Sequence, residues 1–298
     1  MTAIGFEQAK ADPCVFRKVV GGEAEMAVAV HVEDILAHAK DQATMDRLAT
    51  ELEQKFKLKD MGDTGYYMGC HITRNRKARE LKPDQHLYKA TKIPAALGVP
   101  TLSKADEPGD PEEKQKMRKF PNREAVGALM WATTMTRPDI ACAVRAVASF
   151  CENPGPAHKK AVMKILQYLL HTKEWGITYG GQGCGLCMEA HTDSEFGACL
   201  NTRRSVSGAV LMLAKRAISW HSRMLEVTAS GTSEAEYVAL SEVVKQVQEF
   251  MEPSMRVGAV NVFEDNEGAI KLATNKHASR RTKYIDVKRN LVRDASDA

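Results

Sequence analysis

The 298-residue sequence predicts a protein of the α+β / α/β class, with a mixed β-sheet and flanking helices in its C-terminal part. Two observations predict this class. Short apolar runs of strand length recur along the chain, and between them lie longer segments whose apolar residues return at helical spacing. Beyond residue 186 the predicted order is three strands, then a helix, a strand and a helix, which implies a mixed sheet with helices packed against it.

The N-terminal part is predicted to contain a β-hairpin followed by a helix. The apolar residues 27–32 and 35–37 predict two strands, and Glu33 and Asp34 form the acidic turn between them. Residues 41–56 carry apolar side chains at helical spacing, which predicts an amphipathic helix.

A further strand or hairpin is predicted at residues 65–73. Residues 101–119 are rich in proline and in charged side chains, and we expect them to form an exposed connection. Three helices are then predicted: residues 123–135, residues 140–151 after Pro138, and a helix that Pro156 opens.

The glycine-rich segment 180–185 is the predicted domain boundary, because clustered glycines neither pack nor propagate regular structure. It separates a domain of residues 1–180 from a domain of residues 186–298. In the second domain the predicted elements are strands at 186–192, 208–213, 217–221 and 260–264 and helices at 233–251 and 266–274.

The composition is ordinary for a soluble globular protein, with 44% hydrophobic residues, 27% charged residues and a formal net charge of +4. The seven cysteines lack the dense spacing of a disulfide scaffold, and Cys184 and Cys187 lack the second pair that a zinc site requires. No apolar run reaches membrane-spanning length, and the N-terminus lacks a signal-peptide core. We therefore expect an intracellular protein, cytoplasmic or nuclear, without a membrane partner; the sequence leaves the oligomeric state open.

Three acidic residues stand where predicted elements begin or end. Asp193 follows the first C-terminal strand, Glu236 lies in the first turn of a helix, and Asp265 ends a later strand. Acids placed at element ends can converge on one divalent cation, and Mg²⁺ prefers such hard oxygen ligands. A site of this kind activates water and stabilises a leaving oxygen in phosphodiester cleavage, so the pattern predicts a nuclease.

Each acid also has a structural interpretation. Ser233 and Glu236 have the spacing of a capping box, so Glu236 could serve only the backbone at the helix start. Asp193 could be a turn residue at a strand end, and Asp265 could cap the helix predicted at residue 266.

Basic residues cluster in the same C-terminal stretch as the acids. They could bind phosphates or form a solvated surface, and the sequence leaves both interpretations open. The clusters are Arg203-Arg204, Lys215-Arg216, Arg280-Arg281 with Lys283, and Lys288-Arg289.

Short motifs in a fixed order run through nearly the whole chain. They include Asp12-Pro-Cys-Val-Phe16, Phe56-Lys-Leu-Lys-Asp-Met-Gly62, Thr136-Arg-Pro-Asp-Ile140, Ser233-Glu-Ala-Glu-Tyr-Val-Ala-Leu240, Asp265-Asn266 and Arg281-Thr-Lys-Tyr-Ile-Asp286. With these motifs the sequence closely resembles the C-terminal part of copia-type retrotransposon polyproteins, in which a reverse transcriptase precedes a ribonuclease H domain. The resemblance implies a partial reverse transcriptase palm and thumb, followed by a ribonuclease H-like mixed sheet with flanking helices.

The resemblance also implies roles for individual residues. Asp193, Glu236 and Asp265 fall on the first three carboxylates of the family, which hold two Mg²⁺ (or Mn²⁺) ions and hydrolyse the RNA strand of an RNA–DNA hybrid. The expected fourth metal ligand is Asp286, the only late acid in a plausible helix. The residues expected to contact nucleic acid are Arg203, Arg204, Arg281 and Lys283.

The sequence departs from the family in its polymerase motif. Tyr-Val-Asp-Asp in the family reads His31-Val-Glu33-Asp34 here, and the extra methylene of Glu33 displaces a metal-binding carboxylate in a site that tolerates little looseness. The remaining catalytic aspartate of the palm lies outside the chain. We therefore expect no polymerase activity, and the motif could simply be a polar hairpin tip.

Other departures concern the C-terminal domain. Ser279 and Tyr284 stand where the family has histidines, and both ends of the chain look cut, so the second domain is expected to be C-terminally truncated. These features favour an alternative function, namely a catalytically inactive retroelement remnant that only binds nucleic acid.

Overall fold

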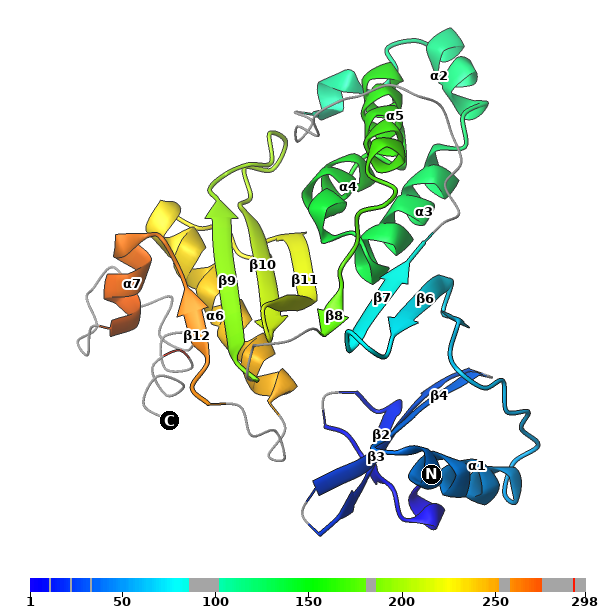
Figure 1. Cartoon of the computed structure of the whole chain (residues 1–298). Helices are drawn as coiled ribbons and strands as arrows, with labels where there is room; N and C mark the ends of the chain where they lie inside the picture. The colour runs from blue at the N-terminus through cyan, green and yellow to red at the C-terminus, as the bar shows by residue number, and fades with distance from the viewer. Residues whose placement is uncertain are drawn as a thin grey trace. The chain divides into compact units, whose positions relative to one another are not determined.

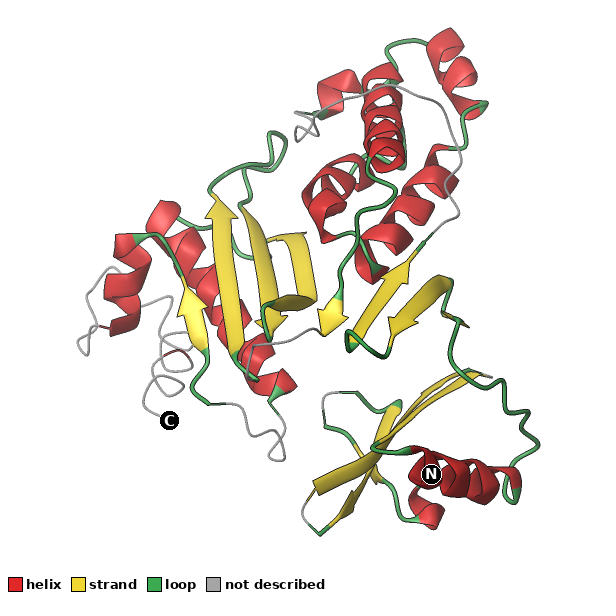
Figure 2. Ribbon diagram, in the orientation of Figure 1, coloured by secondary structure: helices red, strands yellow, loops and turns green. Residues whose placement is uncertain are grey.

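The computed structural model describes residues 1–10, 12–21, 23–32, 34–85, 102–180, 186–251, 258–274 and 292 (Figure 1). The chain divides into two compact units, Met1–Ile72 with Gln246–Val257 and Thr73–Lys245 with Gly258–Ala298. The described residues contain three β-sheets together with helices, so the predicted α+β / α/β class is confirmed (Figure 2). Among the described helices, none combines the length and the apolar character that a bilayer crossing requires.

The first unit contains an antiparallel sheet with one helix. After the short η1 (Thr2–Ile4), the strands pair in the order β1-β2-β3-β4. Their bounds are β1 (Glu7–Gln8), β2 (Val15–Val20), β3 (Glu23–His31) and β4 (Asp34–Ala39). The predicted hairpin is confirmed, because β3 and β4 pair antiparallel with His31 opposite Asp34.

The helix α1 (Gln42–Glu53) begins at Asp41, whose side chain accepts a hydrogen bond from the backbone N–H of Thr44 at 2.8 Å. Its apolar stripe packs on the sheet, which confirms the predicted amphipathic helix. The buried residues of this core are Phe6, Met26, Val28, Leu48 and Leu52. The predicted hairpin at residues 65–73 is also present, as β5 (Tyr66–Tyr67) and β6 (Cys70–Asn75).

The second unit contains a cluster of helices. The strand β7 (Glu80–Asp84) pairs with β8 (Tyr179–Gly180), and the helices lie between them in the sequence. Their bounds are η2 (Lys104–Asp106), α2 (Pro111–Arg118), α3 (Asn122–Met135), η3 (Pro138–Ile140), α4 (Ala141–Ala148) and α5 (Pro156–His171). The three predicted helices are confirmed, and their buried core includes Leu129, Ile140, Val144, Val162 and Ile165.

The exposed connection expected at residues 101–119 was wrong, because this segment contains the helix α2. Asp110 accepts a hydrogen bond from the N–H of Glu113 at 2.8 Å, and Pro111 occupies the first helical position. Acidic side chains in the first turn and basic ones in the last complement the helix dipole. Proline and charge at these positions start a helix instead of preventing one.

Arg137 is a buried cation that joins the turn after α3 to the end of α5. Its guanidinium contacts both carboxylate oxygens of Asp139, at 2.9 and 2.7 Å, and donates to the carbonyl oxygen of Thr172 at 3.1 Å. It also lies over the ring of Tyr168, 5.7 Å from the ring centroid. The motif at residues 136–140 therefore has a structural role here.

The C-terminal sheet has the strand order β11-β10-β9-β12. Its strands are β9 (Met188–Glu195), β10 (Val206–Leu213), β11 (Arg216–Met224) and β12 (Asn261–Phe263). The first three pair antiparallel, whereas β12 runs parallel to β9, so the predicted mixed sheet is confirmed. The helix α6 (Thr232–Phe250) crosses one face of the sheet and α7 (Glu267–Thr274) follows β12 (Figure 2).

The helical cluster contacts the edge strand of this sheet. α4 packs against β11, and the indole N–H of Trp220 on β11 donates to the carbonyl oxygen of Thr133 on α3 at 2.6 Å. Residues 181–185, in the predicted boundary, lie outside the described residues. The division into domains of residues 1–180 and 186–298 stays a prediction.

Candidate metal centre

Asp193, Glu236 and Asp265 form a cluster of three carboxylates. Each offers one oxygen, and these oxygens all lie within 4.8 Å of one another. The three residues come from β9, from α6 and from the segment after β12, more than 70 positions apart at the extremes. It is the only cluster of potential metal ligands found among the described residues.

The register of two parallel strands explains why Asp193 and Asp265 meet. His191 on β9 pairs with Phe263 on β12, and their rings stack with centroids 4.7 Å apart. Asp193 and Asp265 each follow two positions later, which returns their side chains to the same face of the sheet. Along β9 the even-numbered residues from Met188 to Ser194 are buried, and Asp193 lies on the exposed side.

Glu236 is delivered by α6. The helix begins at Thr232, so Glu236 lies in its second turn and not in the first turn that the sequence predicted. The first turn carries Glu234, which accepts a hydrogen bond from the N–H of Ser230 at 2.8 Å. Glu236 is only 4% exposed, and its Oε2 is buried without a hydrogen-bond partner.

The start of α7 is capped by Asn266 and not by Asp265. The Oδ1 of Asn266 accepts a hydrogen bond from the N–H of Ala269 at 3.0 Å. The interpretation of Asp265 as a helix cap is therefore wrong, and its exposed carboxylate can take another partner.

A glycine allows α7 to approach α6 at the site. A Cβ added to Gly268 would lie 2.3 Å from the Oγ and 2.9 Å from the Cβ of Ser233. Gly268 follows Asp265 by three residues and Ser233 precedes Glu236 by three, so this close approach of α7 to α6 lies beside both metal-ligand candidates.

Glu264 is a fourth carboxylate that the sequence analysis missed. One of its oxygens accepts a hydrogen bond from the N–H of Asn266 at 3.0 Å, and the other is buried without a partner. Burial, together with the charges of Asp265 and Asp193, raises the pKa of Glu264. The only signal in the sequence was its position beside Asp265, which ordinary surface acids share.

The carboxylates of this site lie close enough for their negative charges to repel one another. Burial, and then the charges of Glu264 and Asp193, raise the pKa of Glu236 to about 7. Close carboxylates with an orphaned buried oxygen require either a bound proton or a cation. Hard oxygen donors of this kind fit Mg²⁺ or Mn²⁺.

The remaining predicted site residues lie elsewhere or outside the described residues. Asp34 is exposed at the tip of the β3–β4 hairpin. Arg203 is exposed in the loop between β9 and β10, whereas the guanidinium of Arg204 donates to the carbonyl oxygen of Glu226. The predicted site residues outside the described part of the chain are Glu33, Arg281, Lys283 and Asp286.

Comparisons with known proteins place this site in context. The sequence profile of the family "Reverse transcriptase (RNA-dependent DNA polymerase)" matches residues 1–95. The chain is 34% identical over 303 residues to the retrovirus-related Pol polyprotein from transposon TNT 1-94 of Nicotiana tabacum. This alignment covers 96% of the chain and 23% of the polyprotein. The chain is 25% identical over 311 residues to the corresponding polyprotein from transposon RE1 of Arabidopsis thaliana, covering 99% of this chain and 20% of that protein.

The chain belongs to the copia-type retrotransposon polyproteins. This copia-type chain spans about a fifth of the length of the polyproteins it matches. It is also 33% identical over 130 residues to the secreted RxLR effector protein 161 of Plasmopara viticola, covering 44% of this chain and 91% of that protein. In the copia-type chain, the three clustered carboxylates lie outside the segment that the reverse transcriptase profile matches.

Proposed function

We propose that residues 186–298 form a ribonuclease H-like domain that hydrolyses the RNA strand of RNA–DNA hybrids. The observation that carries the proposal is the approach of Asp193, Glu236 and Asp265 to within 4.8 Å. Residues 1–180 are then the C-terminal part of a reverse transcriptase, without polymerase activity of their own.

Mg²⁺ or Mn²⁺ would be held by Asp193, Glu236 and Asp265, and a bound metal supplies an activated water and neutralises the leaving oxygen. The chain's own part is to fix three ligands on rigid elements. Asp193 stands on β9, Asp265 follows the end of the adjoining parallel strand β12, and the buried Glu236 approaches both from α6.

A nucleic acid is the partner that this proposal requires. The 2′-hydroxyls of the RNA strand would distinguish the hybrid from double-stranded DNA. In this proposal the exposed Arg203, in the loop that follows β9, contacts phosphates of the hybrid. The roles expected for Asp286, Arg281 and Lys283 remain part of the proposal.

The test is cleavage of a labelled RNA–DNA hybrid by the full chain in Mg²⁺ and in Mn²⁺. We expect Asp193→Asn to reduce the rate by about 100-fold or more, since metal coordination contributes several kcal/mol to such a reaction. The matched control is Glu195→Gln, which removes an exposed acid two residues along the same strand and should retain most of the rate.

A wild-type chain that melts cooperatively but cleaves no hybrid in either metal would reject the proposal. Hybrid binding without turnover would then support the second candidate, a remnant that only binds nucleic acid. Glu33 in the polymerase motif and Tyr284 in place of a histidine favour this second candidate.

A further inference from the structure

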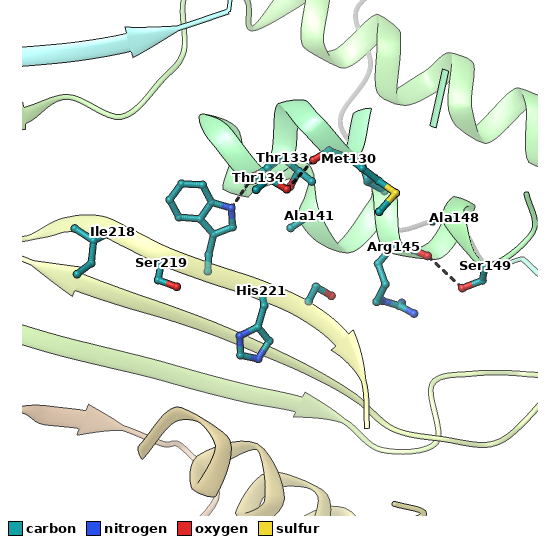
Figure 3. A pocket seen from close by; sticks show the side chains of 13 residues that line it. Met130, Thr133, Thr134, Ala141, Arg145, Ala148, Ser149, Ile218, Ser219 and His221 are labelled. Carbon is teal, nitrogen blue, oxygen red and sulfur yellow. Dashed lines mark hydrogen bonds between the residues drawn. The ribbon is translucent and has the colours of Figure 1, made fainter. Parts of the chain in front are cut away.

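A cavity lies between the helical cluster and the edge strand of the C-terminal sheet (Figure 3). Its volume is about 620 Å³, which is within the range of ligand-binding clefts. Met130 and Thr134 of α3 and Arg145 of α4 line one side, and Trp220 and Ser222 of β11 line the other. None of these side chains belongs to the carboxylate cluster.

The strand register connects this cavity to the candidate metal centre. Gly208 on β10 pairs with Asp193 on β9 and also with Ser222 on β11. Directly paired residues project to the same face, so Asp193, Gly208 and Ser222 form one row across the sheet. With neighbouring strands about 4.8 Å apart, the cavity begins roughly 10 Å from Asp193.

The row between them is open. Gly208 has no side chain, and a Cβ added there would meet no atom within 4 Å. The opposite face of β11 is different: Arg223 is paired with Glu242 of α6 at 3.0 Å, and Figure 3 shows His221 projecting away from α3 and α4. The face that carries Asp193 therefore has no side chain at its central position, Gly208, between Asp193 and Ser222.

Arg145 supplies the charge at the far end of this row. Figure 3 shows its side chain leaving α4 toward β11. Its Nε is buried without a hydrogen-bond partner, and the residues that line the cavity include no carboxylate. A partly buried guanidinium without a counter-charge is costly unless an anion binds it, and its planar fork matches a phosphate.

We propose that the Arg145 cavity binds a phosphodiester of the nucleic-acid strand that crosses the sheet from the Asp193 metal centre. This inference rests on the proposed function for the identity of the strand. A separation of roughly 10 Å corresponds to about three nucleotides at 3.4 Å of axial rise each. The cavity would therefore hold a phosphate about three positions from the one at the metal.

The first test measures binding of a fluorescent RNA–DNA hybrid to the full chain in EDTA, so that cleavage has no influence. Arg145→Gln should weaken binding about 5- to 20-fold at 0.1 M salt and lower the salt slope by about one. The matched control, Arg223→Gln, removes the same charge one residue from Ser222 but on the opposite face, and it should stay within twofold of wild type.

Two further variants separate contact from folding. Arg145→Lys keeps the charge and should recover part of the affinity, and melting curves would show whether Arg145→Gln is folded. Gly208→Leu blocks the row without changing any charge and should also weaken binding. Equal affinities for Arg145→Gln and Arg223→Gln, or no hybrid binding by the wild type, would overturn the proposal.

The position of the phosphate is tested with hybrids that carry one neutral methylphosphonate at successive linkages. The wild-type protein should bind more weakly only when the methylphosphonate stands at one linkage, about three nucleotides from the cleaved bond. Arg145→Gln should bind that modified hybrid as tightly as it binds the unmodified one. Sensitivity spread evenly over all linkages would contradict the cavity. If binding shows this pattern but no cleavage occurs, the proposed nuclease fails while the phosphate site stands.

Discussion

Glu236 on α6 and Glu264 after β12 each keep one carboxylate oxygen buried without a hydrogen-bond partner in the described part of the chain. After burial itself, the charge of Glu264 is the largest cause that raises the pKa of Glu236 to about 7. Burial also raises the pKa of Glu264, and a divalent cation beside the two carboxyl groups would offset the repulsion between their charges. This relationship makes the metal-free site sensitive to pH.

Glu236→Gln should stabilise the metal-free protein at pH 8. The folded Glu236 keeps its proton up to about pH 7, whereas the unfolded residue loses it near pH 4.5, so wild-type stability falls as pH rises between these values. Glutamine removes that loss, which we expect to be on the order of 1–3 kcal/mol at pH 8 and near zero at pH 4. Melting curves of both proteins in EDTA across this range measure the difference. Equal melting temperatures of Glu236→Gln and wild type at pH 8 would contradict the raised pKa of Glu236. The control is Glu267→Gln, which changes an exposed acid on α7.

Mn²⁺ should raise the melting temperature of the wild type at pH 7.5, because a ligand that binds only the folded state stabilises it. At 100 times the dissociation constant the gain is about 2.7 kcal/mol, or roughly 5–10 °C for a unit of this size. Asp265→Asn removes one of the three proposed ligands and should lose most of the shift, whereas Glu195→Gln should keep it. An equal shift in all three proteins would mean that the metal binds elsewhere.

Gly268→Ala should weaken Mn²⁺ binding although Gly268 is no ligand. The new Cβ would lie 2.3 Å from the Oγ of Ser233, so α7 must move away from α6, with a cost of about 1–3 kcal/mol. Adding Ser233→Gly should restore part of both stability and metal affinity. As a control, Gly127→Ala, in α3 with open space around the glycine, should stabilise the protein by about 0.5–1 kcal/mol.

His158 should make the helical cluster sensitive to acid. Its Nδ1 accepts a hydrogen bond from the N–H of Gly155 at 2.9 Å, and its ring stacks on Phe150 with centroids 4.4 Å apart. Burial lowers the pKa of His158, so the unfolded chain binds its proton first and stability falls as pH drops below about 6.5. His158→Ala should cost about 2–4 kcal/mol at pH 7.5 and flatten this part of the profile. His171→Ala, on an exposed histidine of the same helix, should leave the profile as in wild type.

Arg137→Lys should be strongly destabilising, by about 2–4 kcal/mol, although the charge is kept. A lysine cannot contact both oxygens of Asp139 and the carbonyl oxygen of Thr172 together. Thermal or urea unfolding measures the loss. The control is Lys164→Arg, on the exposed face of α5, which should leave the stability unchanged. If Arg137→Lys were as stable as this control, the motif at residues 136–140 would have no structural role.

Local patterns predicted most of the fold. The hairpin at residues 31–34, the helix capped by Asp41 and the order of strands and helices after residue 186 all follow from periodicity and turn residues that act over a few positions. The helix α2 was missed because proline and charge were interpreted as loop signals, whereas Asp110 and Pro111 at those positions begin a helix.

The sequence alone determined most of the helices and strands. Through its resemblance to copia-type polyproteins it also identified Asp193, Glu236 and Asp265 as candidate metal ligands. Only the tertiary structure decided that these acids approach within 4.8 Å, that Glu264 raises the pKa of Glu236, and that Asp193 shares a row with Ser222 beside Arg145. The physical reason is that periodicity acts between near neighbours in the chain. Strand register and helix packing, in contrast, join residues whose separation in sequence carries no information about their distance in space.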